Sequence, residues 1–254
     1  MPSGAPTHEQ DEPDDETRHA VKVVVLACAV MEDLIRPHLD DASVETLYMD
    51  YGLHEKPKKM APALQQKLDA IEEASLILVG YGLCGTGLVG LEAGRHTLVI
   101  PKTHDCIAIL LGSHQEYMRS IAEHPGTYYL SKGWLESRND PLEEYEGYVE
   151  QFGKKAADRV IDTMYRHYDR LCLVAHSEEI LAEQRPRAQV VAAFCKERWG
   201  MEYIERVGSD ALIARLLEAP HHLDRLGDDF VVVAPGGQVT LDLFVEFGAA
   251  KSAR

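Results

Sequence analysis

The sequence predicts an α/β fold, with a parallel, Rossmann-like sheet flanked by helices and divided into two lobes. Short, continuous runs of Val, Ile and Leu recur along the chain, and segments with helical spacing separate them. Strands that are apolar on both sides and alternate with helices are typical of a parallel sheet covered on both faces. The 254 residues, 45% of them hydrophobic, are enough to bury such a core. A single sheet of about seven or eight strands is the alternative arrangement.

The first half of the chain contains a regular alternation of predicted strands and helices. Apolar, β-branched runs predict strands at 21–27, 44–49, 75–80 and 96–100. Helical spacing predicts helices at 30–39, 61–74 and 105–113, and a short helix at 88–93. We expect residues 20–125 to form the first α/β lobe, which carries the candidate site.

The second half is more helical than the first. Strands are predicted at 126–130, 170–175, 201–207 and 229–233. Helices are predicted at 143–168, as one long helix, and at 178–183, 188–199 and 210–218. A second βαβ set therefore begins near residue 170, and we expect residues 126–245 to form a second lobe.

The two ends of the chain lie outside these lobes. Residues 1–19 are acidic and offer few apolar side chains, so we expect a disordered tail and no signal peptide. Residues 246–254 form a predicted C-terminal tail. No apolar run approaches the roughly 18–20 residues that a membrane span needs. Five cysteines, an odd number at low density, favour a reducing, cytoplasmic location over a disulfide framework.

The charge of the chain disfavours binding to some classes of partner. The net charge is −16, from 42 acidic and 26 basic residues, and the sequence has no basic stripe. Nucleic acid and anionic membrane surfaces attract positive charge, so neither is expected as a partner. A small-molecule substrate agrees better with this composition. The sequence does not fix the oligomeric state.

Three cysteines follow predicted strands of the first lobe. Cys28 comes directly after the first strand, Cys84 follows the third and Cys106 follows the fourth. The carboxyl ends of parallel strands meet at one edge of a sheet, where ligands bind. We therefore expect these three thiols to converge. Cys172, inside a strand, and Cys195, on a helix, are expected in the core.

The three thiols and the imidazole of His104 form a candidate metal-ligand set. Zinc accepts Cys and His ligands, and a catalytic zinc site keeps one position open. Three cysteines with one open iron position suit a 4Fe-4S cluster equally well. Asp105, in the same His-Asp-Cys motif, or Asp50, at the end of the second strand, could orient the imidazole. These two carboxylates are the candidate catalytic residues.

Three glycines surround Cys84 in the sequence. Gly82, Gly85 and Gly87 would let the backbone approach a ligand closely, so they are candidate cofactor-binding residues. Their spacing differs from the dinucleotide and P-loop fingerprints and no lysine follows, so they are a weak phosphate signal. The aromatic group at 128, 129 and 134 is expected in the core and not in a ligand wall.

Three segments resemble a bacterial and archaeal family of unknown function: LACAVME (26–32), YGLCGTGLVGL (81–91) and PKTHDCIAILLGS (101–113). The likeness covers most of residues 21–220. Members of that family are soluble proteins, often encoded near corrinoid-dependent methyltransferases of methylamine and betaine metabolism. The resemblance therefore implies a context of corrinoid and one-carbon methyl metabolism, and it supplies no mechanism.

Cys84, His104 and Cys106 also resemble the zinc site of methylcobamide:thiol methyltransferases. Here the separate cysteine precedes the His-x-Cys pair, and the strands predict an open sheet where those enzymes have a barrel. The leading hypothesis is a cytoplasmic zinc protein of methyl metabolism, with methyl transfer as its candidate activity and a small molecule or corrinoid protein as its partner. The alternatives are an iron–sulfur protein with a redox role, a non-enzymatic corrinoid- or folate-binding accessory protein, and a metal-free isomerase that uses two cysteines as acid and base.

Overall fold

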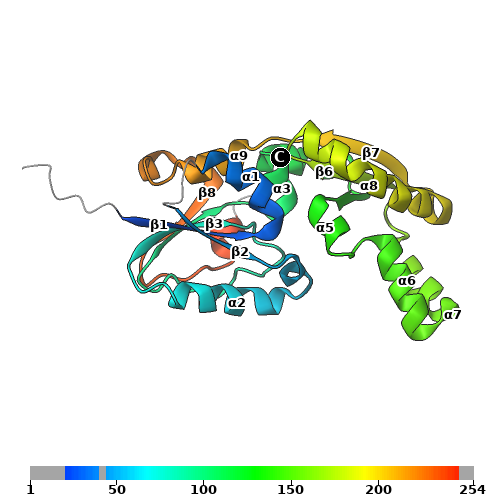
Figure 1. Ribbon diagram of the computed structural model, residues 1–254, viewed down its shortest axis with the longest axis horizontal. Helices are drawn as coiled ribbons and strands as arrows, with labels where there is room; N and C mark the ends of the chain where they lie inside the picture. Colours follow the sequence, from blue (N-terminus) through cyan, green and yellow to red (C-terminus); the bar gives the residue numbers. More distant parts are fainter. Residues whose placement is uncertain (1–20, 40–43, 246–254) are drawn as a thin grey trace, which may run out of the picture.

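The computed structural model describes residues 21–39 and 44–245, and within them it forms two separate sheets (Figure 1). The larger sheet has five strands in the order β2-β1-β3-β4-β8, and the smaller has three in the order β5-β6-β7. Helices flank both sheets, so the predicted α/β class is confirmed. The predicted tails at 1–19 and 246–254 lie outside the described residues. No helix among the described residues is long and apolar enough to cross a membrane.

The first sheet is parallel except at one edge. Its strands are β1 (Lys22–Cys28), β2 (Glu45–Met49), β3 (Ser75–Gly80), β4 (Thr97–Pro101) and β8 (Phe230–Val233). The first four run parallel, and β8 pairs antiparallel with β4. All six residues of β3 are buried, as expected for a central strand covered on both faces. The carboxyl ends of the four parallel strands therefore share one edge.

Helices cover both faces of the first sheet (Figure 1). On one face lies α2 (Pro57–Asp69), and on the other lie α1 (Glu32–Ile35) and α9 (Ala211–Leu217). The remaining elements before residue 125 are η1 (Ala29–Met31), η2 (Arg36–His38), η3 (Tyr51–Glu55), α3 (Cys106–Leu110) and α4 (His114–Glu123). Those near the C-terminal end are η4 (Leu223–Arg225), η5 (Gly227–Asp229) and α10 (Asp242–Val245).

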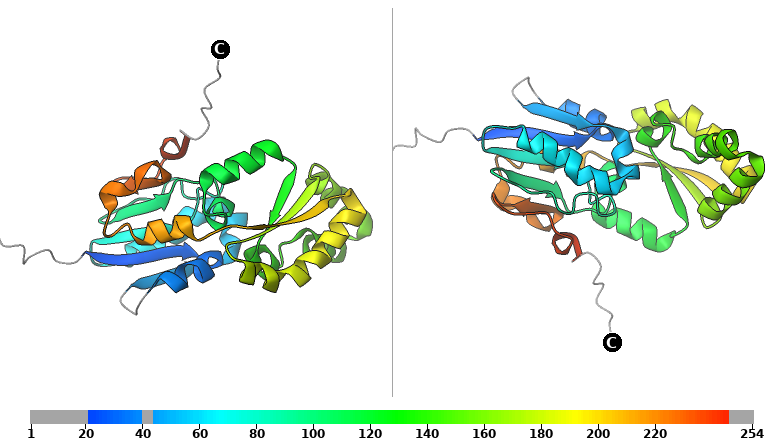
Figure 2. Two further views of the ribbon diagram at one scale, coloured as in Figure 1. Left: turned by 90° about the horizontal axis from the view of Figure 1, so that it is seen from above. Right: turned by 90° about the horizontal axis from the view of Figure 1, so that it is seen from below.

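The second sheet is parallel throughout. It consists of β5 (Thr127–Leu130), β6 (Arg170–Ala175) and β7 (Glu202–Val207). Its helices are α5 (Lys132–Glu136), α6 (Pro141–Phe152), α7 (Lys154–Tyr165) and α8 (Glu178–Trp199). Figure 2 shows the two sheets lying end to end along the long axis of the molecule, and α6 and α7 project together as a helical hairpin in Figure 1. The region between the sheets is where the candidate site is found.

Two helix predictions in the second half are wrong. The long helix predicted at 143–168 is broken into α6 and α7, because Gly153 has a left-handed φ of +78° that ends α6. The helices predicted at 178–183 and 188–199 are one helix, α8, which continues through Pro186. One side of α8 is buried from Leu181 to Cys195, so packing on the sheet outweighs the hydrogen bond that the proline removes.

The segment predicted as a short helix at 88–93 is not helical. It pairs instead with the chain after β8: Gly90 donates its N–H to the carbonyl of Val239 at 2.9 Å, and Val239 donates to Leu91 at 2.8 Å. These bonds satisfy the backbone of 88–93 without a helix. The apolar side chains that suggested a helix are still buried, Leu88 and Leu91 completely.

The chain returns to the first sheet near its C-terminal end. The division of the chain at residue 125 stays a prediction, but the strand that it assigned to the second lobe, Phe230–Val233, pairs with β4. The second sheet with its helices has a hydrophobic cluster of its own. Cys172 and Cys195 are both 0% exposed, which confirms that these two thiols belong to the core.

Candidate functional site

Cys28, Cys84 and Cys106 line one small pocket at the carboxyl edge of the first sheet. Cys28 is the last residue of β1, Cys84 lies in the loop after β3, and Cys106 is the first residue of α3. The structure thus brings together the three thiols that the sequence places at strand ends. Five further residues complete the lining: Val30, Tyr51, Tyr81, Gly133 and Trp134. We call this cavity the thiol pocket.

The loops after β3 and β4 are held together by backbone hydrogen bonds. Leu83 donates its N–H to the carbonyl of Thr103, and Cys84 donates to the carbonyl of His104, both at 2.9 Å. A Cβ at Gly82 would lie 2.7 Å from the backbone carbonyl carbon of Asp105, so a larger residue would separate the two loops. Gly82 therefore acts by close packing between the loops, which places Cys84 beside the His-Asp-Cys segment.

Cys84 has an unusual backbone conformation. Its φ is +48°, in the left-handed region that L-residues with a side chain rarely occupy, and Gly85 follows with a φ of +74°. A strained non-glycine residue at a cavity is a common mark of a functional site. Of the other candidate glycines, Gly87 packs against α2, because a Cβ there would lie 2.6 Å from the sulfur of Met60.

The thiol pocket stabilises neutral thiols. Burial raises the pKa of Cys28, raises that of Cys84 to about 12 and raises that of Cys106 well above its usual value. Asp105 and Cys28 raise the pKa of Cys84 further, and Cys84, Asp105 and Cys28 do the same for Cys106. No Lys, Arg or His is among the described residues that line the pocket. At neutral pH all three cysteines are therefore protonated unless a ligand supplies positive charge.

Tyr81 adds an unsatisfied hydroxyl to the same pocket. The residue is 2% exposed, and its hydroxyl has no hydrogen-bond partner among the described residues. Burial raises the pKa of Tyr81, and the neighbouring Cys28 thiol raises it further. A buried polar group without a partner is costly and points to a missing ligand. Sequence reasoning missed Tyr81, although it directly follows β3 at the same edge.

The other predicted site residues are placed differently. The ring of His104 packs against that of His114, with centroids 5.1 Å apart, and His104 is not among the residues that line the thiol pocket. Asp50 caps η3 by accepting a hydrogen bond from the N–H of Gly52 at 2.7 Å, and it does not line the pocket either. Neither side chain lines the thiol pocket, although the Asp50 carboxylate adds to the effect of burial in raising the pKa of Cys28.

Asp105 lies beside the thiols in a well-defined setting. Its Oδ1 accepts a hydrogen bond from the N–H of Ile107 at 2.9 Å, which caps α3, and its Oδ2 accepts one from the hydroxyl of Tyr117. Burial raises the pKa of Asp105, whereas these hydrogen bonds lower it. Asp105 lines a second, larger cavity together with Cys84 and Cys106.

This larger cavity, of about 800 Å³, lies between the two lobes, and we call it the inter-lobe cleft. Gly85 also lines it, alone among the three candidate glycines. Five aromatic side chains form much of its wall: Tyr117, Tyr128, Tyr129, Trp134 and Tyr168. The group at 128, 129 and 134 was expected in the core; these residues pack against the core and line the cleft as well.

The polar atoms of the cleft wall are mostly engaged within the protein. The indole N–H of Trp134 donates to the hydroxyl of Tyr128 at 2.9 Å, and the hydroxyls of Tyr129 and Ser120 are 2.8 Å apart. With the Tyr117 hydroxyl bonded to Asp105, the cleft offers a ligand mainly aromatic carbon, one carboxylate and two thiols. Such a wall suits a small molecule with an apolar surface.

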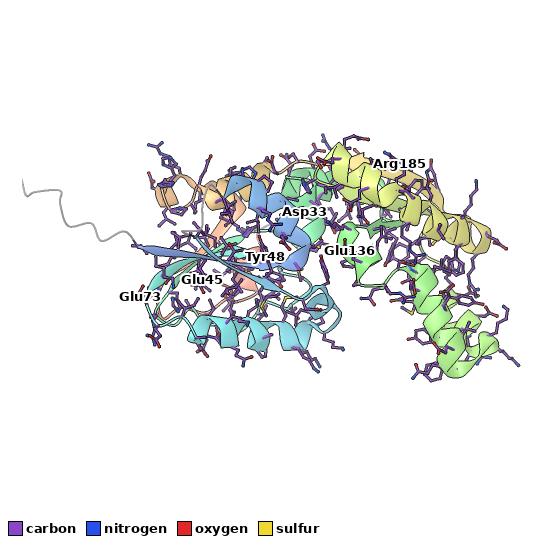
Figure 3. All side chains as sticks on the ribbon, in the orientation of Figure 1. Asp33, Glu45, Tyr48, Glu73, Glu136 and Arg185 are labelled. Atoms are coloured by element: carbon purple, nitrogen blue, oxygen red, sulfur yellow. The ribbon has the colours of Figure 1, made fainter. Side chains whose placement is uncertain are left out.

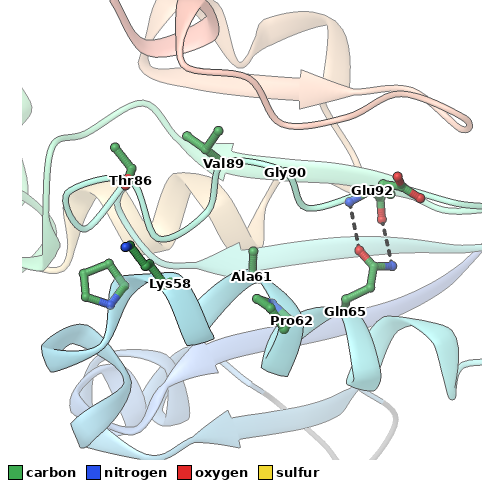
Figure 4. A pocket seen from close by; sticks show the side chains of 9 residues that line it. Lys58, Ala61, Pro62, Gln65, Thr86, Val89, Gly90 and Glu92 are labelled. Carbon is green, nitrogen blue, oxygen red and sulfur yellow. Dashed lines mark hydrogen bonds between the residues drawn. The ribbon is translucent and has the colours of Figure 1, made fainter.

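A third cavity, an open groove of about 1110 Å³, lies between α2 and the loop at 86–92 (Figure 4). Gln65 spans it by accepting a hydrogen bond from the N–H of Glu92 at 2.9 Å and donating one to the carbonyl of the same residue at 3.3 Å. The groove shares no lining residue with the thiol pocket and contains no cysteine or histidine. It is a poorer candidate for a catalytic site.

All five cysteines are free thiols. Within residues 21–39 and 44–245, no group of three or more His, Cys, Asp or Glu side chains is arranged so that it could hold a metal ion. The three thiols of the pocket share a cavity and interact electrostatically, but they do not form a coordination shell as they stand.

The family model described as "Protein of unknown function (DUF1638)" matches residues 48–217, more than half of the chain. The chain belongs to this family. The matched region of this DUF1638 protein includes Cys84, Cys106 and the aromatic wall of the inter-lobe cleft, whereas Cys28 precedes it. Neither the curated proteins nor the solved structures contain a match.

Proposed function

We propose that this DUF1638 protein binds a thiophilic metal, zinc in the first place, through Cys28, Cys84 and Cys106, and acts on a small molecule held in the inter-lobe cleft. The observation that carries the proposal is the convergence of three thiols, one buried and two partly buried, on one pocket without a cation among its lining residues. The further assignment to cytoplasmic one-carbon methyl metabolism, with methyl transfer as the reaction and a corrinoid or corrinoid protein as partner, is supported by the sequence resemblance.

The chemistry of the donor set favours a metal over a metal-free thiol mechanism. A nucleophilic or basic cysteine needs a lowered pKa, usually from a neighbouring cation or helix N-terminus. Here burial and the neighbouring acidic groups raise the pKa of all three thiols. A bound divalent ion supplies the missing positive charge and deprotonates its thiol ligands. The isomerase alternative needs reactive thiolates, and the lining offers only the N-terminus of the short helix α3 at Cys106, where burial still raises the pKa well above its usual value.

Four residues of the thiol pocket would bind the ion and stabilise its ligands. Cys28, Cys84 and Cys106 would hold the ion after their side chains turn toward a common point, and the Tyr81 hydroxyl is available to donate a hydrogen bond to a thiolate. His104 is not included, because its ring packs against His114. When bound, zinc would act as a Lewis acid that activates a thiol or polarises a small substrate.

Asp105 and Tyr117 would handle protons on the cleft side of the site. The Tyr117 hydroxyl donates to Oδ2 of Asp105, and the carboxyl lines the cleft beside Cys84 and Cys106. Burial raises the pKa of Asp105, so this carboxyl can take up a proton more readily than an exposed aspartate. It is positioned to exchange a proton with a molecule bound against the two thiols.

Two alternative functions would use parts of the same site. Three cysteines with one open iron position would also hold a 4Fe-4S cluster with a redox role. The aromatic wall of the inter-lobe cleft favours a second candidate, a non-enzymatic protein that binds a corrinoid or folate. The first differs from the zinc proposal in the metal, and the second needs no metal at the thiols.

Anaerobic purification followed by elemental analysis tests the proposal. We expect about one zinc per chain and no visible colour, and we expect Cys84→Ser and Cys106→Ser to lose the metal. Cys195→Ser is the control, because this thiol lies in the core of the second lobe and does not line the thiol pocket. Iron, sulfide and an absorption band near roughly 400 nm would establish the cluster instead. Protein that takes up neither metal, or that keeps it in both pocket variants, would contradict metal binding at the thiols.

A further inference from the structure

A short helix from outside the first sheet closes the thiol pocket. Gly133 and Trp134, in the middle of α5, are part of the pocket lining, whereas the three cysteines come from the first lobe. In the structure α5 follows β5 of the second sheet and packs against both α8 and η1. It therefore bridges the two lobes and forms a roof over the thiols.

Two polar contacts fasten this roof to the first lobe. Lys132, the first residue of α5, places its Nζ 2.6 Å from Oδ2 of Asp33. Glu136, the last residue of α5, accepts a hydrogen bond from the hydroxyl of Tyr51 at 2.9 Å. Figure 3 shows Asp33 and Glu136 between the two lobes. One contact thus lies at each end of the helix.

The middle of α5 packs closely against the first lobe. A Cβ at Gly133 would lie 2.9 Å from a methyl group of Val30 and 3.3 Å from the ring of Tyr51. Glycine is therefore needed for α5 to approach η1 this closely. Any larger residue at this position would hold α5 away from the first lobe while leaving both polar contacts chemically intact.

The polar contacts at the two ends of α5 can break without a large cost. The side chains of Lys132 and Asp33 are 22% and 37% exposed, so water can replace their contact at low cost. After α5, Arg138 has a left-handed φ of +58°, and Asp140 begins α6 as its N-cap. The roof is thus a five-residue helix between β5 and an irregular connection, held at its ends by solvent-accessible contacts.

We propose that α5 is a movable roof that controls access to the thiol pocket, and that release of its contacts with Asp33 and Tyr51 admits the ligand. The reactivity of Cys28 measures access to the thiol pocket. Cys84 and Cys106 also line the inter-lobe cleft and can be reached from there, whereas Cys28 lines the thiol pocket and not the cleft. The proposal concerns access and holds whichever ligand the thiols bind.

Site-resolved alkylation of the full chain tests the roof. Metal-free protein would be treated with iodoacetamide, and the modification rate of each cysteine would be followed by peptide mass spectrometry. In the double variant Asp33→Asn, Glu136→Ala we expect Cys28 to react about tenfold faster, because the polar contacts that hold the closed state are weakened. Cys172 and Cys195 should keep their slow rates, which excludes general loosening of the fold.

Two further variants complete the test. Gly133→Ala should also accelerate Cys28, because the added methyl group would push α5 from Val30 without removing a charge. Glu205→Gln, which weakens the ion pair with Arg185 in the second lobe, is the matched control and should leave Cys28 unchanged. Unchanged Cys28 rates in both folded roof variants, or a rise that Cys172 and Cys195 share, would overturn the proposal.

Discussion

The two sheets of this protein, one parallel throughout and one parallel except at β8, both have cysteines on their strands or flanking segments, but they place them differently. In the first sheet, Cys28, Cys84 and Cys106 lie at or beyond the carboxyl ends of strands and line a pocket. In the second, Cys172 lies within β6 and Cys195 within α8, and both are completely buried in the core. The position along a strand, and not the residue type, decides whether a thiol can meet a ligand.

Two glycines, one in each region, differ in how closely they pack. The loop that carries Cys84 combines a left-handed cysteine with Gly82, which packs against the backbone of Asp105. In the second lobe, Gly147 of α6 has open space around it, and a Cβ there would touch nothing within 4 Å. The close packing at Gly82 therefore helps to fix the position of Cys84 at the thiol pocket, whereas Gly147 has no such role.

The largest expected effect is the loss of the close loop contact at Gly82. In Gly82→Ala the added methyl group would lie 2.7 Å from both the carbonyl carbon of Asp105 and Oγ1 of Thr103. We expect this variant to lose about 2 kcal/mol of unfolding free energy, measured by urea denaturation, because backbone must move to relieve the overlap.

Gly147→Ala is the matched control in the second lobe. Alanine is the better helix former and meets no neighbour at this position, so we expect a gain of about 0.5–1 kcal/mol. If the two variants changed the unfolding free energy in the same direction, the contrast between the two regions would be wrong.

The strands could be predicted from the sequence with little error. The predicted strands at 75–80 and 170–175 coincide with β3 and β6, because unbroken apolar runs between polar segments leave no other register for a buried strand. Helix boundaries were less predictable. Gly153 breaks a helix and Pro186 does not, since the outcome depends on tertiary packing that a local pattern does not contain.

The site was predictable in part for a similar reason. Parallel strand ends share an edge, so the meeting of Cys28, Cys84 and Cys106 followed from their positions alone. The direction of the His104 ring could not be predicted from sequence position, because it depends on how the loop turns into α3. The contribution of Trp134 depends on how the second sheet lies against the first, which no local pattern specifies.

A second, smaller effect compares the same substitutions in the two regions. At Cys84, with its φ of +48°, glycine relieves strain, so Cys84→Gly should be more stable than Cys84→Ala by about 1 kcal/mol. At Cys195, inside α8, the order should reverse by a similar amount, because alanine favours the helix. Thermal unfolding of the four variants measures both differences. The same order at both positions would show that Cys84 is not strained.

The smallest effect separates the two lobes by pH. Burial and, to a smaller extent, the neighbouring His104 ring lower the pKa of His114 to about 4; burial also lowers the pKa of His176, which follows β6 in the second lobe. Below about pH 6.5 these histidines are protonated in the unfolded chain but stay neutral in the folded protein. The free energy of unfolding therefore decreases as the pH falls from about 6.5 toward 4.

We expect His114→Gln to remove more of this acid-dependent loss than His176→Gln, by an amount under about 1 kcal/mol, because the neighbouring His104 ring adds to the effect of burial at His114. Urea denaturation of the wild type and both variants at pH 7, 5.5 and 4.5 would measure it. A larger effect of His176→Gln would mean that the acid sensitivity arises in the second lobe. It would then be the end of β6, and not the loops beside the thiol pocket, that opens first as the pH falls.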